Sequence, residues 1–259
     1  MYNALFLYTI GIVNSMKKII SIIIATYNAE KTLKRCLNSI VSQKKDQLEL
    51  LIIDGCSTDR TMDIVREFAE SIDVIVSEVD KGIYDAWNKG IRLATGEWIM
   101  FLGADDYLLE GAMNVYWNYL KKQTLDGIDI ITAQSKLIDA KGKYKRVFGN
   151  PYNIKEFRCC MKISHGSTLH NRKLFDELGN ISFKICADYE FLLRKKLNAR
   201  YIETPTIAMQ VGGVSNTIRG LWESFKVKRY CKSIPLLLNV YYLTKGVIGY
   251  YMRKIKIIN

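Results

Sequence analysis

The sequence has few of the residues that mark linkers, metal fingers and dinucleotide sites. It has only three prolines, no low-complexity stretch and no internal repeat, which argues against a linker between separate domains. Its six cysteines form no C-x-x-C pair, and the adjacent Cys159 and Cys160 suit neither a zinc site nor an ordinary disulfide, so a reduced, cytoplasmic compartment follows most simply. No G-x-G-x-x-G follows any apolar run, which argues against a Rossmann dehydrogenase. The 259 residues are therefore expected to form one large domain.

Acidic residues are absent from the end of the chain. The net charge is +12, and every charged residue after Glu223 is basic. Aliphatic residues and tyrosines lie between these cations over 234–252, a mixture that favours a segment lying on an anionic membrane leaflet. A membrane span and a helix packed on the domain are the alternatives, although Lys245 and Gly246 interrupt the apolar run. We expect residues 231–259 to place the protein on the inner face of the cytoplasmic membrane. Nucleic acid explains the charge less well, because no recognition motif accompanies it.

The first residues carry neither a membrane span nor a secretory signal. The stretch from Tyr2 to Val13 is apolar but too short to span, and it lacks a charged start and a cleavage site. Met16, which two lysines follow, directly precedes the first strand-like run and resembles a natural start. We expect residues 1–15 to be a mis-assigned leader or a loose appendage, and residues 16–230 to form the domain.

Apolar runs of strand length alternate with polar tips and helical patterns. The runs at 19–25, 48–53, 73–77 and 97–102 each end in polar residues. This alternation predicts an α/β fold with a doubly wound, mostly parallel sheet. The polar tips should then share one edge of the sheet, where such folds bind ligands. Further along, Lys141-Gly142-Lys143 predicts a hairpin turn within the same domain.

Two adjacent carboxylates follow the fourth run. Asp105 and Asp106 would repel each other unless a cation neutralises them. Hard divalent cations with oxygen ligands suit that need, and such a cation can in turn hold a diphosphate. The alternative is a solvated turn or a helix cap, because Asp is common at both.

Four motifs occur in a fixed order. They are Ala-Thr-Tyr-Asn at 25–28, Asp-Gly-Cys-Ser-Thr-Asp at 54–59, Asp-Lys-Gly-Ile-Tyr-Asp-Ala-Trp-Asn-Lys-Gly at 80–90 and Gly-Ala-Asp-Asp at 103–106. Together they resemble the family 2 glycosyltransferases of the GT-A fold, most closely the branch that builds bacterial O-antigens and exopolysaccharides. The resemblance implies a nucleotide-sugar donor, a divalent metal (Mn²⁺ or Mg²⁺) and an inverting single displacement. It also implies a saccharide acceptor, which such enzymes commonly receive linked to a lipid.

The resemblance places donor-binding residues at the first two strand tips. Thr26, Tyr27 and Asn28 would lie at the nucleotide end, with Tyr27 against the base. Asp54 matches the carboxylate that accepts the uracil N–H in relatives that use UDP-sugars, and its alternative role is to form a turn. Asp59 is expected to cap the next helix instead.

The third and fourth motifs complete the expected donor site. Asp85 and Asn88 lie about one helical turn apart and could share a face towards the donor. Lys81 could meet the diphosphate, and a solvated surface lysine is its alternative. Asp105 is the expected metal and donor ligand, with Asp106 second.

Three positions depart from the family pattern. Gly103 stands where members often carry an Asp two residues before the metal ligand, so the contact made there must be absent or supplied by water. Trp87 stands where many relatives have a phosphate-binding Arg, so that charge must come from elsewhere. Ala25 replaces a frequent Pro, which should matter little for the chemistry.

The second half of the chain is expected to supply the base. Inversion by one displacement needs a base on the face opposite the leaving diphosphate, and a positioned carboxylate can take that proton. The segment 186–194 resembles the family segment that holds this acid, and Asp188 occupies the matching position, with a helix cap as its alternative role. Glu190 is the competitor, although in a helix it would point elsewhere. Arg194 is expected to pair locally.

A polar segment with apolar flanks contains His165, one of only two histidines in the chain. In relatives a similarly placed histidine lies near the donor phosphates or the acceptor, and a satisfied buried histidine is the alternative.

Two other functions fit parts of the pattern. A sugar nucleotidyltransferase would be expected to carry a glycine-rich basic loop after the first strand, and Ala29-Glu30-Lys31 offers none. A non-catalytic nucleotide-sugar-binding protein is the other possibility. It is favoured by Trp87 and Gly103, which stand where family members often carry an Arg and an Asp.

Overall fold

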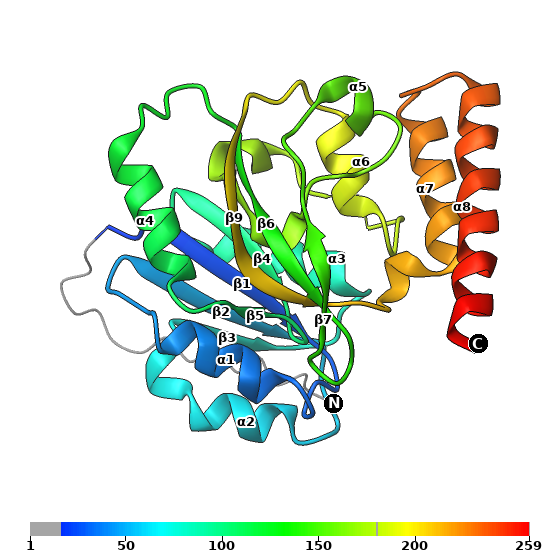
Figure 1. The fold of residues 1–259 in the computed structure, drawn as a ribbon. Helices are drawn as coiled ribbons and strands as arrows, with labels where there is room; N and C mark the ends of the chain where they lie inside the picture. The colour runs from blue at the N-terminus through cyan, green and yellow to red at the C-terminus, as the bar shows by residue number, and fades with distance from the viewer. Residues whose placement is uncertain (1–16, 180, 259) are drawn as a thin grey trace.

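A nine-stranded mixed sheet with helices on both faces forms the part of the protein that the computed structural model describes, residues 17–179 and 181–258 (Figure 1). The strands are β1 (Ile20–Thr26), β2 (Leu48–Asp54), β3 (Val74–Ser77), β4 (Trp98–Gly103), β5 (Tyr107–Leu108), β6 (Ile130–Ile138), β7 (Tyr144–Phe148), β8 (Thr168–Asn171) and β9 (Ala199–Gln210). The helices are α1 (Leu33–Val41), α2 (Thr61–Glu67), α3 (Ile83–Leu93), α4 (Ala112–Lys122), α5 (Ile154–Phe157), α6 (Ala187–Leu193), α7 (Ile218–Tyr230) and α8 (Leu236–Ile258), and a short 3₁₀ turn η2 spans His165–Ser167. The predicted α/β class is confirmed.

The first half of the sheet is parallel, with the strand order β3-β2-β1-β4. The strand ends lie level, because Asp54 is in register with both Thr26 and Ser77, while Ala25 faces Gly103. The polar tips of these strands therefore lie at one edge of the sheet, as the sequence predicted.

Alternating residues of the central strands fill two separate cores. Ile22 and Ile24 pack with apolar residues of α1, α2 and α4, whereas Ile23 packs on the opposite face with Ala86 and Ile91 of α3. Because successive side chains of a strand point to opposite faces, an unbroken run of isoleucines is what a strand covered on both sides requires.

The second half of the sheet contains antiparallel pairs. β8 pairs antiparallel with both β4 and β6, and the long β9 runs parallel to β6. β6 and β7 form the hairpin predicted at Lys141-Gly142-Lys143, where Gly142 has φ +79° and the Asp139 N–H donates to the Lys143 carbonyl oxygen over 3.0 Å. The four sequence motifs thus lie in the parallel half of the sheet, and the antiparallel pairs lie in the other half.

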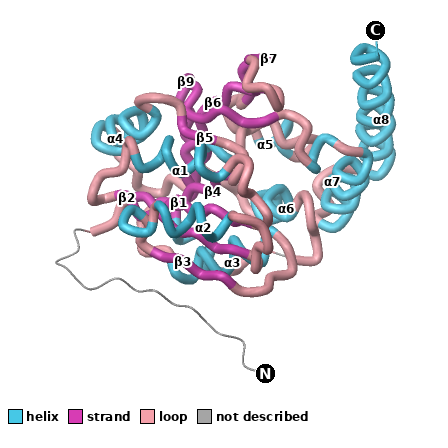
Figure 2. The backbone as a smooth tube through the Cα atoms, turned by 90° about the horizontal axis from the view of Figure 1, so that it is seen from below, coloured by secondary structure: helices cyan, strands magenta, loops and turns pink. Residues whose placement is uncertain are grey.

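Two C-terminal helices stand beside the sheet, with α7 between α8 and the rest of the molecule (Figures 1 and 2). α8 packs along α7, where the Asn239 side chain donates to the Phe225 carbonyl oxygen and Gly246 lies against Leu221. Within residues 17–258, none of the helices combines the length and apolar character of a bilayer span. The leader expected at 1–15 lies outside the described residues.

Candidate active site

The tips of β1 and β2 are tied together around Asp54, which is fully buried. Its Oδ1 accepts from the hydroxyls of Thr26 (2.9 Å) and Ser57 (2.5 Å), and its Oδ2 accepts from the Ser57 N–H (2.9 Å) and the Ser77 hydroxyl (2.8 Å). Asp54 therefore organises this turn, as its alternative role required. Both carboxylate oxygens are occupied in this structure, and the contact of Asp54 with uracil stays a prediction.

Tyr27 stands free above this tied turn. The residue is 66% exposed, while the neighbouring Asn28 has φ +50° and its Oδ1 accepts from the Thr58 N–H over 2.9 Å. The backbone is thus fixed on both sides of an unburied aromatic ring, an arrangement that suits stacking on a flat base. Asp59 accepts from the N–H of Thr61, the first residue of α2, but the cap position of this helix belongs to Arg60, so Asp59 is not the cap that the sequence predicted.

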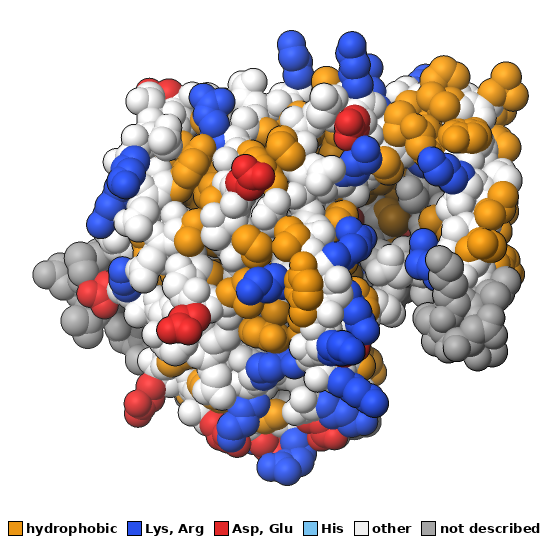
Figure 3. Space-filling view, in the orientation of Figure 1, with side chains coloured by type: hydrophobic (Ala, Val, Ile, Leu, Met, Phe, Trp, Pro, Cys, Tyr) orange, Lys and Arg blue, Asp and Glu red, His pale blue; other side chains and the backbone are white. Residues whose placement is uncertain are grey.

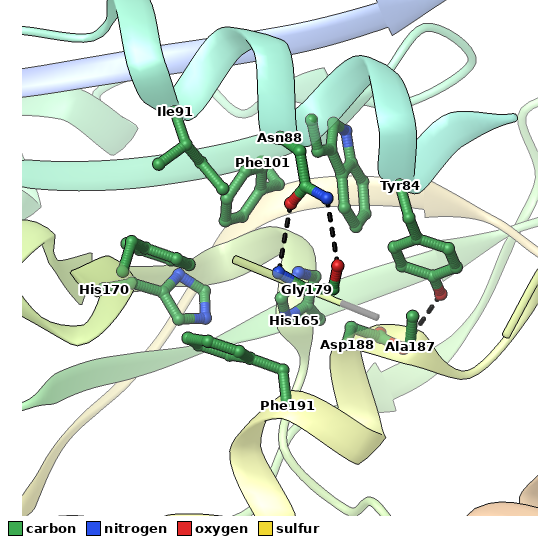
Figure 4. Close-up of a pocket in the computed structure, with 12 residues that line it drawn as sticks. Tyr84, Asn88, Ile91, Phe101, His165, His170, Gly179, Ala187, Asp188 and Phe191 are labelled. Atoms are coloured by element: carbon green, nitrogen blue, oxygen red, sulfur yellow. Dashed lines mark hydrogen bonds between the residues drawn. The ribbon is translucent and has the colours of Figure 1, made fainter. Parts of the chain in front are cut away.

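The three candidate residues of the third motif, Lys81, Asp85 and Asn88, lie in different surroundings. Asp85 accepts from the Lys81 N–H over 2.9 Å, so it closes the start of α3, while the Lys81 side chain is exposed. Asn88 is buried, and both of its side-chain polar atoms bond to the backbone of Gly179, at 3.0 and 3.1 Å (Figure 4). Asp85 and Asn88 thus hold loops in this structure, and their contacts with a donor stay predictions.

Asp105 and Asp106 differ sharply in exposure. Asp105 is exposed, and Asp106 is buried with its Oδ1 accepting from the Gln210 N–H over 3.0 Å. Burial, together with the charge of Asp105, raises the pKa of Asp106 to about 7. A Cβ at Gly103 would lie 2.8 Å from Asp105 Oδ1 and 3.1 Å from Asp106 Oδ2. The space of the missing family Asp is therefore taken by these two carboxylates.

Asp105 and Asp106 suit a divalent ion whose remaining ligands come from a substrate and from water. The described residues contain no cluster of three or more His, Cys, Asp or Glu that could hold a metal alone. Mg²⁺ is usually bound by one or two carboxylates, with substrate phosphates and waters as its other ligands. Asp105 and Asp106 match that mode, and a bound cation would favour the ionised form of Asp106, whose pKa is raised first by burial and then by the charge of Asp105.

Asp188 lies in the first turn of α6 and faces α3. Its Oδ1 is 2.8 Å from the Tyr189 N–H and 3.0 Å from the Tyr84 hydroxyl (Figure 4). Burial raises the pKa of Asp188 to about 6 despite these hydrogen bonds. The cap position of α6 belongs to Cys186, so Asp188 is not the cap. A carboxyl that ionises near neutral pH suits a general base.

The other candidate acid is engaged elsewhere. Glu190 is 1% exposed, and its Oε1 pairs with Arg194 Nε over 2.9 Å. Arg194 also bonds to Glu177, so the expected local pairing of Arg194 is confirmed. This ion pair holds Glu190 in a different environment from that of Asp188.

Both ring nitrogens of His165 are buried, and they lack hydrogen bonds to the described residues. Burial lowers the pKa of His165 to about 4. The ring stacks on Phe101 at 5.5 Å and lies 5.4 Å from the ring of Trp87. A neutral histidine without partners is not the satisfied core histidine that was the alternative. It lines a small cavity of about 30 Å³ that also touches Asp188.

A second, larger cavity of about 760 Å³ reaches from the catalytic candidates to the C-terminal helices. His165, Gly166 and Asp188 line this cavity, and Tyr242 and Lys245 of α8 also contribute to its wall. A Cβ at Gly166 would lie 3.9 Å from Asp106 Oδ2, so the cavity wall at Gly166 adjoins Asp106. Figure 3 shows the surface hollowed beside these helices.

Two residues around Asp188 were not singled out in the sequence. Tyr84 lies inside the third motif, so its position was available as a signal. Glu223 of α7 accepts from the N–H groups of Ile185 and Cys186, at 2.5 and 2.8 Å, and thereby fixes the segment that precedes Asp188. Nothing local in the sequence indicates that contact.

Comparison with known proteins identifies the family. The model of glycosyl transferase family 2 matches residues 21–200. The chain belongs to this family. A PGL/p-HBAD biosynthesis glycosyltransferase of Mycobacterium bovis is 32% identical over 230 residues, which are 83% of this chain and 84% of that protein.

Solved structures agree with the fold. S. aureus TarS 1-349 in complex with UDP-GlcNAc superposes with a TM-score of 0.66 at 16% identity, covering 88% of this chain and 71% of that one. The mannosyltransferase PcManGT from Pyrobaculum calidifontis, in complex with GDP-Man and Mn²⁺, gives 0.61 at 18% identity, covering 90% and 74%. These similarities confirm the GT-A fold. The three relatives are not named for O-antigen or exopolysaccharide synthesis, so they show the family and not that branch.

Proposed function

We propose that this glycosyltransferase inverts the configuration of a sugar that it moves from a UDP-sugar donor to a saccharide acceptor. The observation that carries the proposal is Asp188, a carboxyl with a pKa of about 6 that lines a cavity of about 760 Å³, and Gly166 in the wall of the same cavity adjoins Asp106. The Asp105–Asp106 pair suits a cation that binds the diphosphate, and Asp188 suits removal of the proton from the acceptor hydroxyl. A single displacement needs those two groups on opposite faces of the reacting sugar.

The donor binds at the edge formed by β1, β2 and β4. Tyr27 stacks on the base, and the Asp54 carboxylate accepts a hydrogen bond from the base N–H. The diphosphate lies near Asp105. A divalent ion, Mn²⁺ or Mg²⁺, held by Asp105 and Asp106 would neutralise the charge that develops on the leaving diphosphate. TarS, which has the same fold, is known with UDP-GlcNAc, and this supports UDP as the nucleotide.

The acceptor occupies the larger cavity with its hydroxyl at Asp188. The ionised carboxylate takes the hydroxyl proton as the new C–O bond forms, and the C–O bond to the diphosphate breaks on the other side of the ring. Tyr84 and the Tyr189 N–H hold the carboxylate in place. His165 lines both cavities, and because its pKa is lowered to about 4, it is a weaker base than Asp188, whose pKa is about 6.

The protein works on the inner face of the cytoplasmic membrane, on a lipid-linked acceptor in surface polysaccharide synthesis. Leu237, Tyr241, Ile248 and Met252 are 85, 56, 59 and 55% exposed. Their spacing puts them on one stripe of α8. Figure 3 shows hydrophobic side chains gathered over this helix. With no acid after Glu223, this stripe and its basic neighbours suit an anionic leaflet.

Thermal-shift screening against UDP-, GDP- and dTDP-sugars with Mn²⁺ tests the donor assignment. A ligand that binds only the native state raises the melting temperature, so UDP-sugars should give the largest increase. Slow release of UDP from the matching donor should accompany it, because a transferase can pass a sugar to water. Binding without any release would favour a non-catalytic binding protein, and formation of a UDP-sugar from UTP and a sugar phosphate would indicate a nucleotidyltransferase.

A further inference from the structure

The helix that carries Asp188, α6, begins without a side-chain cap of its own. Cys186 occupies the cap position, and its side chain makes no cap hydrogen bond. Backbone N–H groups at a helix start have no acceptor within the helix, so they need partners from elsewhere. Asp188 Oδ1 accepts from the Tyr189 N–H in the first turn. The N–H groups of Ile185 and Cys186, just before the helix, are left for another acceptor.

Glu223 on α7 supplies that acceptor from a distant part of the chain. Its Oε1 accepts from the N–H groups of Ile185 at 2.5 Å and Cys186 at 2.8 Å. The Cys186 thiol donates over 3.7 Å to the carbonyl oxygen of Gly220, three residues earlier on α7. Hydrogen bonds to an ionised acceptor are stronger than neutral ones, and two of them on adjacent N–H groups fix the direction of the backbone. The backbone that leads into Asp188 is therefore held by α7.

The same short segment is held on its other side by α3. The Tyr84 hydroxyl lies 2.6 Å from the Ile185 carbonyl oxygen and 3.0 Å from Asp188 Oδ1 (Figure 4). Ile185 thus bonds to α7 through its N–H and to α3 through its carbonyl oxygen. Tyr84 bonds to the Asp188 carboxyl directly, whereas Glu223 bonds to the backbone that places it.

Glu223 also acts on Asp188 through its charge. Burial lowers the pKa values of the neighbouring histidines and raises those of the neighbouring thiol and phenols, so these groups are neutral at the pH where Asp188 ionises: His165, His170, Cys186, Tyr84 and Tyr189. Lys228 of α7 lines the larger cavity with Asp188, and its charge acts on the Cys186 thiol. The charge of Glu223 adds to the larger effect of burial and raises the pKa of Asp188 further.

We propose that Glu223 is a positioning residue for the base: from α7 it fixes the segment that leads into α6, so that the Asp188 carboxyl faces the acceptor hydroxyl. The inference rests on the proposed function, because it takes Asp188 as the base. It makes α7 a part of the catalytic apparatus as well as the helix on which α8 packs. A displacement of about 1 Å at a reacting group can lower the rate about a hundredfold, so a residue remote from the substrate can control the reaction in this way.

Replacing Glu223 by Ala and by Gln separates its hydrogen bonds from its charge. Alanine removes both, whereas glutamine keeps an oxygen that can accept from both N–H groups and loses only the charge. The assay is the release of UDP, at saturating Mn²⁺, from the UDP-sugar that stabilises the wild type most, with water as the acceptor. We expect Glu223→Ala to lower kcat about tenfold to a hundredfold and to leave the KM for the donor unchanged. Glu223→Gln should keep kcat within about threefold of the wild type.

The pH profile of the glutamine variant tests the effect of the charge. Because the charge of Glu223 raises the pKa of Asp188, Glu223→Gln should move the midpoint of kcat/KM to lower pH, which a purely structural role would not do. Glu203→Ala and Glu203→Gln remove the same groups from an exposed position of β9 and should change neither kcat nor the midpoint. Wild-type UDP affinity, and a melting transition above the assay temperature, show in each variant that the fold persists.

Several outcomes overturn the proposal. They are a wild-type kcat in Glu223→Ala, equal losses of kcat in the alanine and glutamine variants, a higher donor KM in place of a lower kcat, and a midpoint in Glu223→Gln that stays or rises. If kcat falls only in proportion to the folded fraction, Glu223 serves stability alone and the proposal is wrong. Full UDP release by Asp188→Asn would instead contradict the proposed function, which the other outcomes leave intact.

Discussion

Transfer should depend on the ionisation of Asp188, and Tyr84 should help to set the pH at which it occurs. The carboxyl must be ionised to accept a proton, and burial raises its pKa to about 6, with a smaller contribution from the charge of Glu223. His165 and Cys186, which also border Asp188, are neutral in this range, because burial lowers the pKa of the histidine and raises that of the thiol. At saturating Mn²⁺, which would keep the Asp106 carboxyl ionised although its own pKa is raised to about 7, the value of kcat/KM should therefore rise with pH to a midpoint near 6 and then level off.

Replacing Tyr84 by Phe should move that midpoint upward. The hydroxyl lies 3.0 Å from Asp188 Oδ1 and 2.6 Å from the Ile185 carbonyl oxygen. A hydrogen bond to a charged group contributes about 1.5–3 kcal/mol. At about 1.36 kcal/mol per pKa unit, a complete bond would shift the midpoint by about one to two units. Because one hydroxyl proton is divided between two acceptors, we expect an increase of about one unit.

The assay is the pH profile of kcat/KM for wild type and Tyr84→Phe, measured from roughly one unit below to two units above the wild-type midpoint. Asp188→Asn serves as the control, and it should bind UDP normally but lose about 10²–10⁴-fold in transfer and show no acidic limb. A downward shift in Tyr84→Phe would refute the reasoning. It would mean that the hydroxyl donates only to Ile185 and accepts from the protonated acid.

Three further predictions concern the donor site and the C-terminal helix. Asp105→Asn should abolish Mn²⁺-dependent UDP binding in calorimetry without lowering the melting temperature, and an unchanged affinity would exclude Asp105 as the metal ligand. Asp54→Asn should weaken UDP binding by about 1.5–3 kcal/mol, an assignment that loses its basis if the wild type binds UDP and GDP equally. Truncation after Tyr230 should abolish sedimentation with anionic vesicles while UDP binding persists. High salt should release the full-length protein only partly, because apolar contacts are not screened; no binding at low salt would contradict membrane docking.

The edge of the sheet that holds the polar strand tips could be predicted from the sequence because its signals are local. Each apolar run ends within one residue of an observed strand end, and parallel strands joined by helices place their ends at the same edge. The number of hydrogen bonds that a carboxylate accepts, by contrast, depends on residues that are distant in the sequence. Asp54 accepts from Thr26, Ser57 and Ser77, which come from three different strand tips, so the sequence could not show how completely this carboxylate is engaged.

The larger cavity could not be predicted in the same way, because its wall comes from elements that are distant in the sequence. Lys228 lies in a basic stretch between the exposed Lys226 and Arg229, and its neighbours give no sign that it alone is buried. Its burial arises where α7 meets α8 and the loop that contains Cys159. Hydrophobic periodicity places apolar residues inside, but a lysine enters the interior only through tertiary contacts. A role that depends on such a residue therefore becomes visible only after the helices have been placed around the cavity.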